Sequence, residues 1–223
     1  MGPNSAKTEN LIARLATAPA WKPLPQPSRR VIAWLAASLP FWALGTVVLG
    51  PSIAMERFAI EPLLIVEQSA IVATAVTAAI AAFVSVIPGA PRLEWMPLPP
   101  LALWVFSVLG RWFDDIGELD ARAISVGIDD QCLVPAVIIG VIPSLLIVAM
   151  LRRGAPLQPR ITLALASLAT GAFVASGIEL FHLVDIDLTA LVWHFGVITV
   201  VVIASFCIGP RILDWRSLKS KNG

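Results

Sequence analysis

The sequence predicts an all-α fold: a polytopic membrane protein built as a six-transmembrane-helix bundle with a short cytoplasmic N-terminal arm. Two observations carry this prediction. Of the 223 residues, 57% are hydrophobic and the mean hydropathy is +0.83, more than the core of a soluble domain needs. The apolar residues also form continuous runs, without the alternation that a membrane-spanning β-strand would show.

The apolar runs divide into six candidate spans. A bilayer core about 30 Å thick needs roughly 20 helical residues, because each adds about 1.5 Å of rise. The candidates are residues 31–50, 69–87, 97–109, 132–151, 161–181 and 189–208. The third is the shortest, because Pro97, Pro99 and Pro100 crowd its start and Arg111 follows its apolar run.

The positively charged residues set the orientation, because Lys and Arg stay in short cytoplasmic loops. With six crossings, thirteen of the sixteen Lys and Arg residues fall on one side. Omitting the third span would move Arg152 and Arg153 to the other face. The pattern therefore predicts both termini in the cytoplasm and divides the chain into an arm (1–30), a transmembrane domain (31–208) and a basic cytoplasmic tail (209–223).

The arm combines a short amphipathic helix with a Pro-rich linker. Leu11, Ile12 and Leu15 share one face of the predicted helix, and Trp21 and Leu24 follow among the prolines. About three turns of helix are marginal in water without a partner. We expect the arm either to dock in the groove of a partner protein or to lie on the anionic leaflet.

Few ionisable groups lie in or near the spans. Glu67 lies just outside the apolar run of the second span, Cys132 opens the fourth, and Cys207 near the inner end of the sixth is expected to be a small buried residue. The two cysteines lie on opposite faces of the membrane, too far apart for a disulfide.

Motifs of catalysis are missing from the sequence. It contains no phosphate-binding loop, dinucleotide fingerprint, nucleophile elbow or paired-histidine metal motif. We therefore expect neither an enzyme nor a cofactor. A small transporter or channel is the alternative, although an almost wholly apolar midplane argues against it, and a structural membrane partner is a third class.

Several short motifs, taken in chain order, resemble one known family. They are Leu11-Ile12-Ala13-Arg14-Leu15, Leu101-Ala102-Leu103-Trp104, Cys132-Leu133, Leu151-Arg152-Arg153-Gly154-Ala155-Pro156, His182, Val192-Trp193-His194 and Gly209-Pro210-Arg211-Ile212-Leu213-Asp214-Trp215. On these residues the chain resembles the NrsF family, six-span negative regulators of sigma factor in the bacterial inner membrane. The resemblance covers nearly the whole chain.

The resemblance implies that the arm holds an extracytoplasmic-function sigma factor at the membrane and releases it on redox or metal stress in the envelope. The implied partner-binding residues are Leu11, Ile12, Leu15, Trp21 and Leu24. The partners expected are this sigma factor and the bilayer, without direct contact to nucleic acid.

The resemblance also implies a sensor on the outer side, with Cys132 and His182 as the candidates. Family members commonly carry a second outer cysteine after the position of His182, where this chain has Leu183. A single Cys132 leaves three chemistries open: oxidation, pairing between subunits, or metal binding together with His182.

Overall fold

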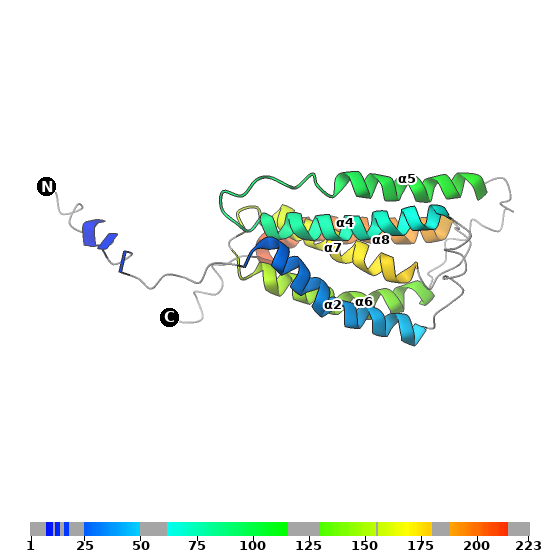
Figure 1. The fold of residues 1–223 in the computed structure, drawn as a ribbon, viewed down its shortest axis with the longest axis horizontal. Coiled ribbons are helices and arrows are strands. Elements are labelled where there is room, and N and C mark those ends of the chain that lie inside the picture. The colour runs from blue at the N-terminus through cyan, green and yellow to red at the C-terminus, as the bar shows by residue number, and fades with distance from the viewer. Residues whose placement is uncertain are drawn as a thin grey trace.

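The chain folds as a bundle of long helices. The computed structural model describes residues 8–10, 12–13, 16–17, 25–49, 62–115, 130–154, 156–179 and 188–213, and these ranges contain helices and turns without a strand. The long helices are α2 (Pro27–Leu49), α4 (Pro62–Val84), α5 (Leu98–Asp115), α6 (Asp130–Leu151), α7 (Pro159–Ile178) and α8 (Leu188–Ile212). The all-α prediction is confirmed for this part of the chain (Figure 1).

Each long helix overlaps one of the six candidate spans. The largest differences are in α4, which starts at Pro62, seven residues before the expected start, and in α5, which continues to Asp115, six residues beyond the expected end. Pro99 and Pro100 occupy its first turn, where an N–H has no helical acceptor, so they start the helix rather than break it.

Three helical stretches are long and apolar enough to cross a membrane. They are Leu63–Val84, Pro159–Ile178 and Phe195–Ile212, and two shorter apolar helices are Leu98–Gly110 and Ile139–Leu151. The protein is therefore suited to a membrane by the length and composition of its helices. Six crossings remain a prediction.

Helix α7 forms the centre of the bundle. It packs against α2, α4, α6 and α8, and 72% of its apolar span is buried, compared with 11% for α8. Alanines on α4 and α7 contribute much of the buried surface, including Ala78, Ala82, Ala169 and Ala172. Small side chains let helix backbones approach closely, which is how helices associate in lipid.

Short polar contacts also join the helices. Ser85 on α4 and Thr162 on α7 lie 2.8 Å apart between their hydroxyl oxygens, and the Ser167 hydroxyl donates to Ser205 on α8 at 2.5 Å. The Gln68 amide donates to the carbonyl of Ser176 at 2.8 Å. Interhelical hydrogen bonds of this kind add modestly to helix association in lipid.

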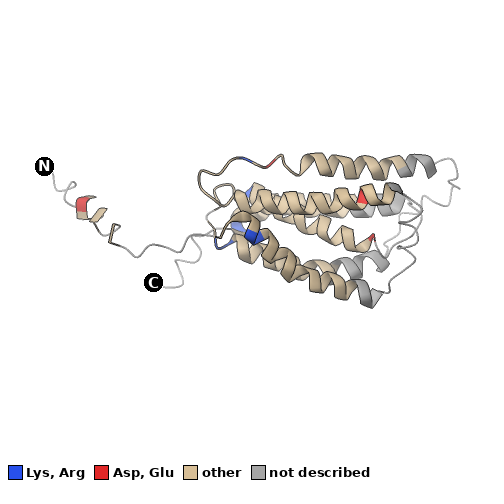
Figure 2. Ribbon diagram, viewed as in Figure 1, with Lys and Arg blue, Asp and Glu red and all other residues tan. Residues whose placement is uncertain are grey.

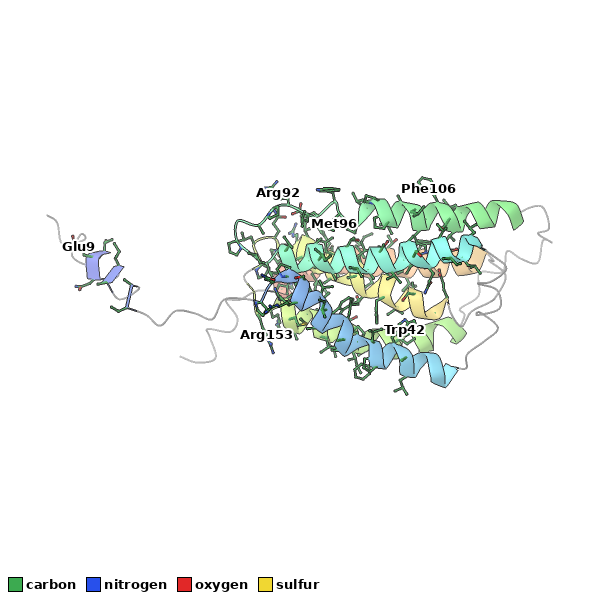
Figure 3. All side chains as sticks on the ribbon, in the orientation of Figure 1. Glu9, Trp42, Arg92, Met96, Phe106 and Arg153 are labelled. Carbon is green, nitrogen blue, oxygen red and sulfur yellow. The ribbon has the colours of Figure 1, made fainter. Side chains whose placement is uncertain are left out.

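Helix α5 is the peripheral member of the bundle. It lies alongside α4 in Figure 1, and its Phe106 ring, labelled in Figure 3, is 71% exposed. Its inner face is held by Trp104, whose ring lies 4.8 Å from that of Phe195 on α8, measured between centroids. An exposed aromatic side chain at mid-helix fits a surface that faces lipid.

Candidate functional site

The arginines whose side chains the structure describes gather at one end of the bundle, as the blue segments of Figure 2 show. This end, which we call the arginine end, contains the start of α2, the ends of α4, α6 and α8, and the start of α7. Its arginines are Arg29, Arg30, Arg152, Arg153, Arg160 and Arg211. Arg92 lies toward the same end in the connection between α4 and α5 (Figure 3).

Arg30 ties the start of α2 into the bundle. Its side chain is only 4% exposed, one guanidinium nitrogen donates to the carbonyl of Met150 on α6, and the group lies 4.5 Å above the centre of the Phe83 ring on α4. Its Nη1 atom is buried without a hydrogen-bond partner among the described residues. Helix α2, which follows the arm directly, is therefore joined to α4 and α6 by one charged side chain.

The charge of Arg30 survives its burial. Burial lowers the pKa of this guanidinium below its ordinary value, and the nearby charge of Arg153 lowers it further. Arginine is the most basic side chain and is not deprotonated in proteins, so the Arg30 side chain remains positive at neutral pH. A charged group in this place needs the Met150 carbonyl and the Phe83 ring as partners.

A second junction lies one turn further along α2. The Trp34 ring is fully buried, its Nε1 donates to the Pro143 carbonyl of α6 at 3.0 Å, and it packs against Phe173 of α7 with ring centroids 5.5 Å apart. Together, Arg30 and Trp34 fix the first turns of α2 against three helices. The base of the arm is therefore rigidly placed.

Within the arm, the described residues between 8 and 17 are helical and exposed. The Thr17 hydroxyl donates to the carbonyl of Ala13 at 2.9 Å, and Ile12 is 60% exposed. Exposure leaves the Ile12 side chain open to a partner. Leu11, Leu15, Trp21 and Leu24 lie outside the described residues.

Both sensor candidates lie beyond what the structure describes in side-chain detail. Cys132 is in the first turns of α6, where its backbone alone is described, and His182 lies outside the described residues. Helix α6, which contains Cys132, starts opposite the arginine end, and α7 ends there at Ile178. Among the described residues no cluster of three His, Cys, Asp or Glu side chains could hold a metal ion.

Two features depart from the sequence-based expectations. Cys207 is exposed, so the expectation of a small buried residue was wrong; α8 packs mainly on α7 and leaves most of its surface uncovered. Glu67 lies inside α4 and is only 1% exposed. Its spacing to Ile71, Thr74 and Ala78, all buried on α4, is a helical signal that could have placed it in the core.

Taken together, the fold and its arginine end define a helical protein suited to a membrane, with a basic end and exposed helical residues between positions 8 and 17. The sequence matches the family described as negative regulator of sigma F (NrsF) over residues 15–215, and the chain belongs to this family. No match is found among curated proteins or among solved structures. Membership makes the chain a negative regulator of transcription whose partner is a sigma factor.

Proposed function

We propose that the chain is an anti-sigma factor that crosses the bacterial inner membrane six times, with both termini in the cytoplasm. It holds a sigma factor of the extracytoplasmic-function class through its arm and releases it on redox or metal stress in the envelope. It acts by occlusion, without enzymatic chemistry or a cofactor. The observation that carries the proposal is the family match over residues 15–215.

The helix directions support the orientation. Helix α2 starts at the arginine end and α8 finishes there, with the intervening helices alternating in direction (Figure 1). An even number of crossings returns the chain to the side from which it started. Because Arg and Lys stay on the cytoplasmic side, the arginine end is the cytoplasmic one.

The exposure of the described residues between 8 and 17 supports the role of the arm as the binding element. Ile12 belongs to the apolar face that the sequence assigns to this helix, together with Leu11 and Leu15, and its side chain is 60% exposed. Burial of an apolar helix face in the groove of a partner is favourable, because it removes apolar surface from water. In this proposal Trp21 and Leu24 extend the contact, and the sigma surface they cover is the one that core polymerase needs.

Release in this proposal begins on the outer side. In this proposal Cys132 and His182 face the envelope, in keeping with the start of α6 and the end of α7 opposite the arginine end. A chemical change at the thiol of Cys132 would be transmitted along α6. The carbonyls of Met150 and Pro143 on this helix accept hydrogen bonds from Arg30 and Trp34 of α2. The arm continues directly from α2, so α6 and α2 connect the proposed sensor with the proposed binding element.

Two double variants test the arm. Leu11→Glu with Leu15→Glu places charge on the apolar face, while Ala13→Glu with Thr17→Glu adds the same charge at the same spacing on the opposite face. Transcription from a sigma-dependent promoter should rise in the first variant and stay repressed in the second, at equal amounts of protein in the membrane. Equal repression by both variants would contradict arm-mediated binding.

A further inference from the structure

Three arginines converge on the last turn of α8. Arg152 donates from its Nε atom to the carbonyl of Ile212 at 3.0 Å, and Arg211 lies in the last turn itself. Arg160, at the start of α7, holds its guanidinium 5.8 Å from the centre of the Phe206 ring. We call Arg152, Arg160 and Arg211 the α8 triad; all three side chains are exposed.

A close backbone approach brings the triad together. Gly209 of α8 lies so near the start of α7 that a Cβ added to it would come within 2.9 Å of the Cα atom of Arg160. The backbone positions of Arg160 and Arg211 are thus held close together by the packing of α7 on α8, and Arg152 joins them through its hydrogen bond to Ile212. Within the described residues no carboxylate forms an ion pair with them.

An exposed apolar strip begins directly beside the triad. Val200, Ile203 and Phe206 follow at three-residue spacing on α8, and they are 66%, 58% and 42% exposed. A surface with positive charge at the end of an apolar strip is complementary to an amphiphilic ligand. The negative headgroup of such a ligand would contact the arginines, and its hydrocarbon chain would lie along the strip. An acidic protein surface would satisfy the charges but would not cover the strip.

We propose that the α8 triad is a binding site for an anionic phospholipid. The lipid phosphate accepts hydrogen bonds from the three guanidinium groups, and its acyl chains lie along Val200, Ile203 and Phe206. Basic pockets between helices on the cytoplasmic side commonly bind anionic lipid headgroups. Arginine suits phosphate because its guanidinium group can donate two parallel hydrogen bonds to the phosphate oxygens. This site does not depend on sigma-factor binding by the arm.

The test is native mass spectrometry of the full-length protein titrated with phosphatidylglycerol, phosphatidylethanolamine or inorganic phosphate. Replacing all three triad residues by Gln should weaken phosphatidylglycerol binding about a hundredfold, or roughly fivefold for each arginine. The matched control replaces Arg29, Arg92 and Arg153 by Gln, which removes the same charge from the same end, and should change binding less than about fivefold.

Several outcomes would overturn the site. Equal losses of lipid binding in the two triple variants would show diffuse electrostatic attraction and not a site. Equal binding of phosphatidylethanolamine would show that the site does not distinguish headgroups by net charge. Equal binding of inorganic phosphate would show that the apolar strip contributes nothing to binding. Loss of sigma-factor binding with lipid binding unchanged would make the triad a protein contact. If the triple variant unfolds, Arg211→Gln alone, which breaks no described hydrogen bond, should still weaken lipid binding about fivefold.

Discussion

Adding a single methyl group at Gly209 should loosen the packing of α7 against α8. A Cβ atom there would lie 2.5 Å from the carbonyl oxygen of Pro159 and 2.9 Å from the Cα atom of Arg160. Non-bonded carbon atoms prefer separations of about 3.5–4.0 Å. Both neighbours belong to the backbone, so they cannot rotate away as a side chain would, and the two helices must move apart locally.

The cost follows from two opposing effects. Overpacking of a well-packed interior costs about 1–3 kcal/mol, and contact with backbone places Gly209→Ala at the upper end of that range. Alanine is a better helix former than glycine by about 1 kcal/mol, which offsets part of the loss. We expect Gly209→Ala to lower the free energy of unfolding by about 2 kcal/mol.

The same helix supplies the matched control. Gly196, also in α8, has no atom within 4 Å of an added Cβ, so Gly196→Ala keeps only the favourable helix propensity. Unfolding of the purified protein by dodecyl sulfate titration in mild detergent measures both variants. Gly209→Ala should unfold at a lower dodecyl sulfate fraction than the wild type, and Gly196→Ala at an equal or higher one. Equal shifts for the two variants would refute the close approach at Gly209.

Three further variants probe the path from the arm to the outer side. Arg30→Met should lower the free energy of unfolding by about 1–3 kcal/mol in the same titration, because a buried carbonyl loses its charged donor; an unchanged midpoint would contradict that role. Trp34→Phe keeps the ring but removes the donor to Pro143, so we expect a loss of about 1 kcal/mol, with no loss arguing against that bond. Cys132→Ser should leave repression intact and abolish induction by oxidant or metal in a promoter assay; normal induction would exclude this thiol as the sensor.

The helices were largely predictable because their apolar runs are long and continuous. Hydropathy alone located all six long helices, and the count of Lys and Arg predicted that α2 starts and α8 ends at one end of the bundle. The end of α5 was missed because Arg111 follows the apolar run, and a charged residue does not by itself stop a helix. Local sequence thus determines where these helices lie, but less well where they end.

The contacts between helices were harder to predict. Arg30 was counted as one more basic residue before the first span, yet it is buried against Met150 and Phe83, which lie 120 and 53 positions away in the chain. Hydropathy averages over a window and carries no information about such distant partners. For the same reason Cys207 was expected to be buried, although α8 has few neighbours.

Binding of a sigma factor by the arm can be measured with the full-length protein in lipid nanodiscs, using each extracytoplasmic-function sigma factor of the source genome in turn. A variant that lacks residues 1–25 is measured alongside. We expect one sigma factor to bind the full-length protein and removal of the arm to abolish this binding. If no sigma factor binds, or if the truncated protein binds equally well, the arm does not hold a sigma factor.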